Sequence, residues 1–374
     1  MFIIVTYLYC YIIIVHTNRY NTSHKLPPEN NRDIVSVVIA CRNEEDNIIK
    51  LTYDIENQDF DKDRYQMIVV DDHSEDKTLL MLKEREKEWD QLMVVSQDQD
   101  KKGKRQAIRK GVELAKGDII FCTDADCILG RNWIRSILDY FDDQNVFLVS
   151  SPVEYSTTEG FFEKFQYLEF LSLVAFGAGS IDRDNPILCN GANLAFRKKI
   201  YEEIPTSILS RFVTDDISLL HYIAKNHPGS ICFAREQDAI VQTLPHKNYI
   251  SFINQKVRWI SRSQLESNNY MINIALVVLL MNLFITFFFA LSIFNILFPL
   301  EISLSSFSKY LLVILFSAKY IIDYRFLSSY LIFFNKRSLT SYILPFEILY
   351  SIYISLIVTL SFIMRPHWKN RIRY

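Results

Sequence analysis

The apolar positions along this chain follow two patterns. Between about residues 30 and 265, short apolar runs alternate with longer segments in which Lys and Glu are frequent. Residues 2–15 and the region from residue 271 onward instead contain long apolar runs with few charges. The first pattern is typical of a folded α/β domain, and the second of helices that cross or line a membrane.

Four short apolar runs predict strands in the central region. They occupy residues 34–40, 67–70, 92–95 and 118–122. A segment with a helical pattern follows each of the first three runs, which gives an alternating order of strands and helices. Such alternation indicates a parallel sheet with right-handed crossover connections. We therefore expect residues 30–265 to fold as one α/β domain.

The N-terminal apolar run predicts a membrane anchor. Residues 2–15 are apolar apart from Thr6 and several tyrosines, and the run is short for a span, which needs about 20 residues. A signal peptide would have a basic start and a small-residue cleavage site, and the sequence shows neither. We expect residues 1–17 to form an uncleaved anchor, either a tilted span or a helix in the interface.

The C-terminal region, residues 271–364, predicts about three membrane segments. Residues 271–300 contain no charge, and residues 342–364 are almost as apolar. Between them, residues 310–322 are apolar but include Lys319. Charges inside a membrane usually face protein or reach toward the surface, so the middle segment is the weakest of the three.

The basic tail, residues 365–374, conflicts with this count. If residues 20–265 lie in the cytoplasm, three crossings place the tail on the other side, but basic flanks favour the cytoplasm. Either the middle segment does not cross, or the tail is an exception to the rule. In both cases we expect an integral membrane protein of a bacterial inner membrane, with residues 30–265 in the cytoplasm.

Charge and cysteine content argue against several classes of protein. The formal net charge of −2 over 374 residues gives no indication of a nucleic-acid partner. The six cysteines form no CxxC pair and no Cys/His spacing that suits zinc. We expect them to stay reduced, as in a cytoplasmic domain.

Polar side chains follow three of the predicted strands. They are Arg42 and Glu44 after the first, Asp71 and Asp72 after the second, and Asp124 and Asp126 after the fourth. Ligands of open α/β sheets bind outside the carboxyl ends of the strands, so we expect these side chains to converge there. In an Asp-x-Asp sequence the carboxylates can face a divalent cation that also binds diphosphate oxygens. The basic turn at residues 101–105 supplies positive charge for phosphate, unless it is only a solvated loop.

The motifs, in their order along the chain, resemble those of family 2 glycosyltransferases, which are inverting enzymes of the GT-A type. The resemblance runs from about Val35 to Trp259. It implies a Rossmann-like domain that binds a nucleotide-sugar, with a bond from Asp72 to the base. The residues that it implies in nucleotide-sugar binding are Ala40, Arg42, Glu44, Asp72, Lys104 and Asp124.

The sequence Asp124-Ala125-Asp126 resembles the DxD motif of this family. The resemblance implies that Asp126 binds a divalent metal, Mg²⁺ or Mn²⁺, and that Asp124 lies beside it near the ribose or phosphate. A metal in this position neutralises the charge that develops on a nucleotide leaving group.

The sequence Thr214-Asp215-Asp216 resembles the Thr-Glu-Asp motif, whose Asp is the general base of the family. By position that base is Asp216, with Asp215 as the alternative because it stands where Glu is commoner. Either carboxylate could instead cap the helix that the pattern predicts from Ile217. As a base, the carboxylate would take the acceptor hydroxyl proton while that oxygen attacks the anomeric carbon in a single displacement.

Two further segments resemble parts of the family's acceptor and donor site. Residues 190–197 resemble the segment that lines the sugar pocket, and residues 255–259 resemble the QxxRW motif of membrane-integrated synthases. The residues that these segments add are Gly191, Asn193, Gln255, Arg258 and Trp259. For the last two, anchoring at the membrane interface is the simpler alternative.

Together these motifs predict an enzyme that moves a sugar from a nucleotide-sugar donor to a lipid-linked or glycan acceptor near a membrane. A processive polysaccharide synthase is an alternative that QxxRW permits, although few membrane segments are present for a channel. A non-catalytic scaffold that binds nucleotide-sugar is another alternative. Degenerate motifs would be typical of such a scaffold, whereas every acidic position that catalysis needs is present here. A soluble nucleotidyltransferase would explain neither residues 214–216 nor the C-terminal apolar segments.

Overall fold

The computed structural model describes residues 1–17, 33–209, 215–266, 269–297, 306–364, 367–368 and 371–372. The chain divides into two compact units. The sheet unit comprises Asn21–Thr157 and Ser180–Pro245, and the helical unit comprises Met1–Tyr20, Thr158–Gly179 and His246–Tyr374. The predicted domain limits of 30–265 differ from these, because residues 158–179 and 246–265 belong to long helices that group with the helical unit.

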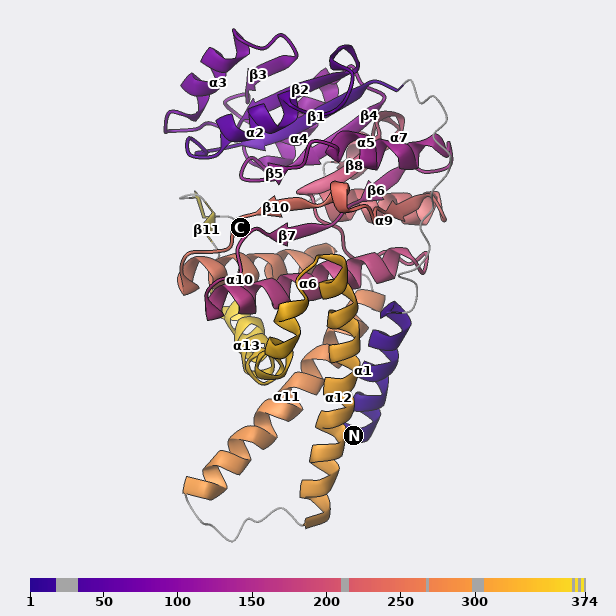
Figure 1. The fold of residues 1–374 in the computed structure, drawn as a ribbon, viewed down its shortest axis with the longest axis vertical. Helices are drawn as coiled ribbons and strands as arrows, with labels where there is room; N and C mark the ends of the chain where they lie inside the picture. Colours follow the sequence, from indigo (N-terminus) through magenta and orange to yellow (C-terminus); the bar gives the residue numbers. More distant parts are fainter. Residues whose placement is uncertain are drawn as a thin grey trace. The chain divides into compact units, whose positions relative to one another are not determined.

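The sheet unit contains a seven-stranded sheet with the order β3-β2-β1-β4-β8-β6-β9 (Figure 1). Its strands are β1 (Val35–Cys41), β2 (Tyr65–Asp71), β3 (Leu92–Ser96), β4 (Ile119–Thr123), β6 (Leu148–Ser150), β8 (Asn193–Arg197) and β9 (Ile231–Phe233). The strands β1 to β4 pair in parallel, which confirms the predicted parallel sheet. The strand β8 runs antiparallel to β4 and β6 and extends the sheet beyond the predicted strands.

A second, three-stranded sheet in the same unit has the order β5-β10-β7. Its strands are β5 (Ile128–Leu129), β7 (Val153–Tyr155) and β10 (Val241–Thr243). Since β5 begins just after the Asp-x-Asp sequence, this sheet fixes the chain on the far side of that loop.

Helices connect the parallel strands and cover the large sheet. They are α2 (Ile48–Glu56), α3 (Thr78–Glu86), α4 (Lys104–Leu114), α5 (Trp133–Leu138), α7 (Lys198–Glu203), α8 (Thr206–Leu209) and α9 (Asp215–Asn226). One apolar core joins α4 and α9 to the sheet, with Ile108 and Leu220 packed in the same cluster as Val38 and Val70. Because α4 and α9 share this core, their first residues are held in fixed positions relative to the strand ends.

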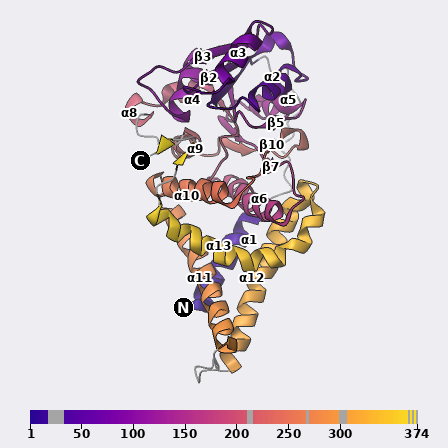
Figure 2. The ribbon, with the colours of Figure 1, turned by 90° about the vertical axis from the view of Figure 1, so that its left-hand side faces the viewer.

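The helical unit consists of α1 (Phe2–Thr17), α6 (Phe161–Ile181), α10 (Tyr249–Glu266), α11 (Asn269–Leu297), α12 (Ser306–Phe333) and α13 (Ile343–Ile363). Helix α1 packs beside α11 and α12, and α13 packs against α10 and α11 (Figure 1, Figure 2). Among the described helices, two segments are long and apolar enough to cross a membrane, Asn269–Phe294 and Arg337–Ile363. Helix α1 is apolar but shorter. The predicted middle segment is part of the 28-residue helix α12, which carries several charges.

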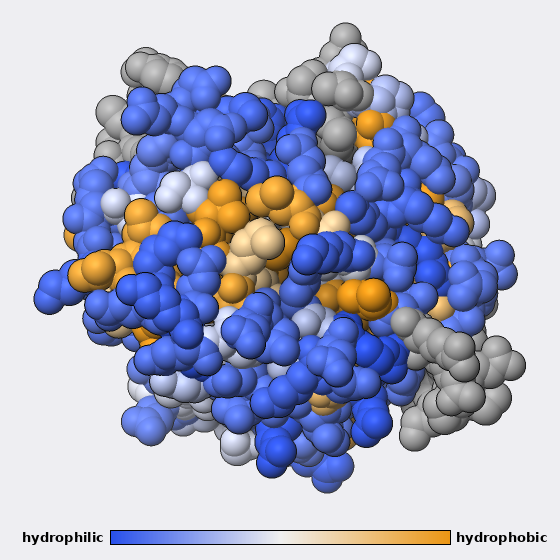
Figure 3. All heavy atoms as spheres, turned by 90° about the horizontal axis from the view of Figure 1, so that it is seen from above, coloured by the Kyte–Doolittle hydropathy of each residue, from blue (hydrophilic) through white to orange (hydrophobic). Residues whose placement is uncertain are grey.

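Exposed side chains differ in kind between the two units. The face of the sheet unit that Figure 3 shows is mostly hydrophilic, with hydrophobic side chains gathered mainly near its middle. On α11 and α13, large apolar side chains are exposed, among them Phe287, Leu297 and Phe362. Apolar exposure along a whole helix is rare on soluble monomers and is suited to contact with lipid. Of the predicted basic tail, the structure describes only β11 (His367–Trp368) and β12 (Arg371–Ile372).

A buried ion-pair cluster joins three helices of the helical unit. The ammonium of Lys319 contacts the carboxylates of Asp323 (2.7 Å) and Glu347. The hydroxyl of Tyr9 donates to Asp323, at 2.9 Å from each carboxylate oxygen. Lys319 is only 1% exposed, and a buried charge that loses its partners is strongly destabilising. The cluster therefore fastens α1 to α12 and α13.

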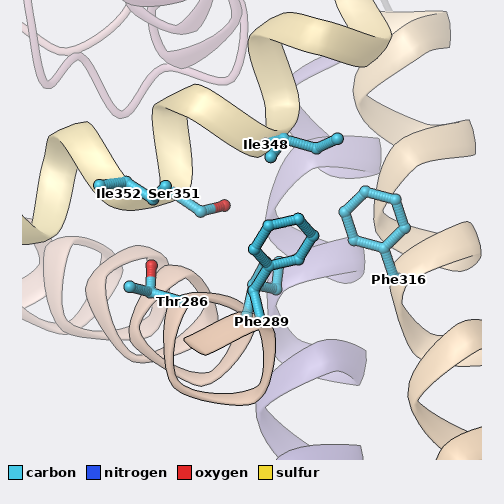
Figure 4. Close-up of a pocket in the computed structure, with 7 residues that line it drawn as sticks. Thr286, Phe289, Phe316, Ile348, Ser351 and Ile352 are labelled. Carbon is cyan, nitrogen blue, oxygen red and sulfur yellow. The ribbon is translucent and has the colours of Figure 1, made fainter. Parts of the chain in front are cut away.

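An apolar pocket of about 130 Å³ lies among α11, α12 and α13 (Figure 4). Apart from the hydroxyls of Thr286 and Ser351, apolar side chains line it: Ile285, Phe289, Phe316, Ile348 and Ile352. A nucleotide site needs polar groups that orient the ligand, and charged ones for its phosphates. This pocket is therefore suited to an alkyl chain and unsuited to a nucleotide.

We predict that Gly117→Ala destabilises the sheet unit. A Cβ atom at Gly117 would lie 2.6 Å from both the carbonyl oxygen of Ile34 and the backbone nitrogen of Ser36. Strand backbone does not yield easily, so we expect a loss of about 1–3 kcal/mol in the free energy of unfolding, measured by denaturation of the purified protein. Gly130→Ala is the matched control, since its Cβ would lie no closer than 3.9 Å to another residue. Equal stability of the two variants would contradict the prediction.

Candidate active site

Hydrogen bonds join the loops that follow β1 and β2. The backbone N–H of Asn43 donates to Ser74 Oγ (3.0 Å), and that of Glu75 donates to Asn43 Oδ1 (2.8 Å). Asn43 and His73 have left-handed φ angles of 51° and 60°, which are uncommon for residues other than glycine. Such angles persist where the surrounding contacts enforce them. The two strand ends therefore hold each other in one fixed geometry.

The side chain of Arg42 holds the loop that follows β2. This side chain is 2% exposed. The guanidinium donates to the carbonyl oxygens of Asp72 (2.9 Å) and His73 and to the carboxylate of Glu75 (2.7 Å). The resemblance implies a contact of Arg42 with the nucleotide-sugar, but in the structure its guanidinium donates to the loop after β2. Ala40, also expected at the ligand, lies partly buried in β1 opposite Val70.

The carboxylate of Asp72 is buried and holds the start of α4. Both of its oxygens lie 3.0 Å from the backbone nitrogen of Gly103, which donates to them. Gly103 precedes α4 and has a φ of 101°, an angle that other residues rarely adopt. The sequence indicated a basic turn here but not this contact. Because Asp72 fixes Gly103, it also fixes the next residue, Lys104.

Lys104 lies between two of the predicted acidic positions. Its ammonium forms an ion pair with Asp124, and the two side chains are 38% and 37% exposed. Burial disfavours the charge on Lys104, but the negative charges of Asp124 and Asp216 outweigh this effect and raise its pKa. Lys104 therefore stays protonated at neutral pH and interacts with residues from both motifs.

Negative charge is concentrated around Asp126. Burial, together with the charges of Asp124 and Glu44, raises the pKa of Asp126 to about 6. Lys104 offsets this repulsion only in part. The structure thus brings together Glu44 from the loop after β1 and both aspartates of the Asp-x-Asp sequence, as the strand-end argument predicted.

The acidic residues of this site fit a divalent metal only if water or a bound ligand completes its coordination. Within the described part of the chain, no three His, Cys, Asp or Glu side chains are grouped closely enough to hold a metal ion. Mg²⁺ is usually held by one or two carboxylates together with substrate phosphates and water. Asp124 and Asp126 suit this second arrangement, since their mutual repulsion would be relieved by a cation.

Asp216 lies in the first turn of α9 and is held by two backbone groups. Its Oδ2 accepts from the N–H of Gly191 (3.1 Å), and its Oδ1 accepts from the N–H of Ile217 (3.0 Å). A Cβ atom on Gly191 would lie 2.8 Å from Asp216 Oδ2, so this close approach requires glycine. Thr214 and the side chain of Asp215 lie outside what the structure describes.

Asn193 occupies a different place from the one that we expected. It is fully buried at the start of β8. Its Oδ1 accepts from the indole of Trp133 (3.0 Å), and its Nδ2 donates to the carbonyl oxygens of Pro152 (2.7 Å) and Ala239 (2.8 Å). These bonds make Asn193 a core residue that joins the two sheets, rather than a side chain exposed to a sugar.

Gln255, Arg258 and Trp259 lie on α10 in the helical unit, partly buried. Between them, Lys256 is buried and bonds to Glu169 of α6 (2.5 Å), with its ammonium 4.2 Å from the centre of the Trp259 ring. Burial lowers the pKa of Lys256, although Glu169 opposes this shift. This ion pair could not be predicted from the sequence, in which Lys256 is only a lysine among aromatic residues of a predicted helix. It fixes the rotation of α10 about its own axis.

The fold is that of the GT-A glycosyltransferases. The chain is similar to the mannosyltransferase PcManGT from Pyrobaculum calidifontis, solved in complex with GDP-Man and Mn²⁺, with a TM-score of 0.59 and 18% identity over 95% of each chain. The particular family follows from the sequence, because residues 36–205 match the model of glycosyl transferase family 2. Over residues 36–205 the chain thus carries a glycosyl transferase family 2 domain.

Two curated relatives are similar over part of their length. The glycosyltransferase AglE of Haloferax volcanii is 27% identical over 170 residues, which is 46% of this chain and 54% of that protein. The beta-monoglucosyldiacylglycerol synthase of Trichormus variabilis is 33% identical over 113 residues, 30% of this chain and 24% of that protein. The matched region is therefore about half, or less, of the length of these relatives.

We predict that Asp126→Asn stabilises the metal-free protein at pH 7.5. The folded-state pKa of Asp126 is about 6, above its ordinary value of 3.8. Its ionised form therefore costs the fold up to about 3 kcal/mol above pH 6, and nothing below pH 4. Thermal unfolding in chelator from pH 4 to 8 should show an advantage of the variant that grows with pH. The exposed Asp90→Asn is the control, and an advantage independent of pH would refute the assignment.

Proposed function

We propose that this protein is an inverting glycosyltransferase that moves a sugar from a nucleotide-sugar donor, with the help of Mg²⁺ or Mn²⁺, to an acceptor at a membrane surface. One observation carries the proposal. Lys104 forms an ion pair with Asp124 and also lies close enough to Asp216 for that charge to raise the pKa of the lysine, which supports one site made by the Asp-x-Asp loop and the first turn of α9. Donor and acceptor chemistry need these groups to be adjacent.

The donor end of this site is formed by the loops after β2 and β4. We assign Asp124 and Asp126 to a metal on the diphosphate. The family resemblance gives Asp72 to the base, but its carboxylate is buried and bonded to Gly103, so we assign it to holding this loop. When bound, the metal would neutralise charge on the departing nucleoside diphosphate. Lys104, which is protonated, would add a second positive charge to the same leaving group.

Asp216 is our candidate for the general base. Its carboxylate would take the proton of an acceptor hydroxyl as that oxygen forms a bond to the anomeric carbon, while the bond from this carbon to the diphosphate breaks. The N–H groups of Gly191 and Ile217 orient the carboxylate for this task. A single displacement inverts the anomeric configuration. Asp215 stays the alternative base.

We assign the protein to a membrane and its acceptor to the lipid-linked or membrane-proximal glycans. Two apolar helical segments, the exposed apolar side chains of α11 and α13, and a relative named for a glycolipid product support this assignment. We assign the sheet unit to a reducing compartment such as the bacterial cytoplasm, with which six described cysteines that form no disulfide are consistent.

The experiment that tests this function is donor turnover by the detergent-solubilised protein. We expect release of nucleoside diphosphate from one member of a panel of UDP-, GDP- and dTDP-sugars, with Mn²⁺ and membrane lipid as acceptor. Asp216→Asn should lower turnover at least about 100-fold without weakening nucleotide binding, because it removes a general base. Asp90→Asn is the control. Full turnover by Asp216→Asn would move the base to another residue, and nucleotide binding without turnover on any donor would favour a scaffold.

We predict that Gly191→Ala also impairs turnover. The added Cβ would displace the carboxylate of Asp216, because it would lie 2.8 Å from Oδ2. A misplaced catalytic group costs on the order of 10–100-fold in rate, so we expect a loss of this size with an unchanged donor affinity. Steady-state kinetics on the identified donor measure both quantities. Gly130→Ala serves as the control, and a variant as active as this control would show that Asp216 tolerates displacement.

A further inference from the structure

We propose that Lys104 is an internal placeholder for the metal. Its ammonium pairs with Asp124 in the ligand-free protein and moves to the donor's diphosphate when metal and donor bind. This inference rests on the proposed function and concerns how the same site is loaded. It assigns to Lys104 two successive partners, a carboxylate of the protein and then a phosphate of the ligand.

The first step of the argument is that Lys104 and a metal compete for Asp124. The Nζ of Lys104 contacts Asp124 Oδ1 directly. A metal that used this oxygen would meet the ammonium at close range, and two cations repel strongly where water is partly excluded. Either the metal stays away from Asp124, or Lys104 withdraws from it.

The second step is that Lys104 is free to move while its backbone is not. The Lys104 side chain is 38% exposed and is a flexible four-carbon chain with a single ion-pair partner among the described residues. Its backbone follows Gly103, which both oxygens of Asp72 hold. A movement of the ammonium therefore needs only rotations of the side chain, and α4 keeps its place.

The third step is that a diphosphate would supply the alternative partner. Lys104 is the first residue of α4, an 11-residue helix whose N-terminus favours negative charge. A diphosphate held by a metal on Asp124 would lie near this same turn, since Lys104 contacts Asp124. Each anion keeps a cation as its partner through the exchange, because the divalent metal replaces the ammonium at Asp124 and the ammonium pairs with the diphosphate.

If Lys104 is a placeholder, removing its ammonium changes the affinities for the metal and for the nucleotide in opposite directions. Removal should strengthen binding of the metal alone, since no ammonium then competes for the carboxylate of Asp124. It should weaken binding of a nucleoside diphosphate without metal, since a cation for phosphate is lost. A lysine that only stabilised the loop would weaken both.

The test compares Lys104→Met with Lys116→Met in the full-length, detergent-solubilised protein. Lys116 is exposed in the same unit, so its variant controls for the loss of one positive charge. Binding of Mn²⁺ alone is followed by electron paramagnetic resonance, and binding of UDP and GDP in chelator by calorimetry. We expect Lys104→Met to bind Mn²⁺ about 10-fold more tightly than Lys116→Met, and the preferred nucleotide about 10-fold more weakly.

Two results would overturn the placeholder. One is an equal Mn²⁺ affinity in the two variants, and the other is weaker binding of both ligands by Lys104→Met. Lys104→Gln, which keeps a polar side chain, repeats the test if Lys104→Met unfolds at a lower temperature than the control. Failure of the proposed function is distinguishable, because the wild-type protein would then bind no nucleotide even with Mn²⁺. Wild-type turnover together with equal Mn²⁺ affinities would reject the placeholder alone.

Discussion

The candidate site depends on one buried carboxylate, that of Asp72. It accepts from Gly103 with both oxygens, and Arg42 in turn holds the backbone carbonyl of Asp72 itself. These contacts connect β1, the end of β2 and the start of α4, three elements that are far apart in the sequence. A charged acceptor makes such bonds stronger than neutral ones. Without the Asp72 carboxylate, Gly103 would lose the partner that stabilises its unusual backbone angle, and the backbone of Lys104 would no longer be held in place.

Beside this carboxylate, Glu44, Asp124 and Asp126 lie close enough together for their charges to interact. Burial raises the pKa of Asp126, and the negative charges of Asp124 and Glu44 add to this shift. Proteins accept such costs where a ligand relieves them, which is why perturbed carboxylates gather at functional sites. Here the relief is provided in the free protein by one lysine, and only in part. A site arranged in this way is ready for a cation and for the anion that accompanies it.

The positions of Asp72, Asp124 and Asp126 were predictable, because a parallel sheet brings the carboxyl ends of its strands to one edge whatever the side chains. What a side chain does there was less predictable. The motif gave Arg42 and Asn193 to the ligand, but the structure uses one to hold a loop and the other to join two sheets. Hydrogen-bond partners depend on distant residues such as Trp133, which no local pattern reveals. For the same reason, the assignment of α6 and α10 to the helical unit was missed, since it follows from their partners and not from their own sequence.

Lys104, Lys256 and Lys319 are each paired with carboxylates, and their surroundings separate two uses of the same interaction. Lys256 and Lys319 are almost wholly buried, and each fastens helices together through partners that are buried as well. Moving either would expose a bare charge to an apolar interior, so both are fixed. Lys104 and Asp124 are each more than a third exposed, so water can replace either partner at small cost. Of these three lysines, Lys104 is the one whose ion pair can open without disturbing the fold, and it lies where the donor's charge would arrive.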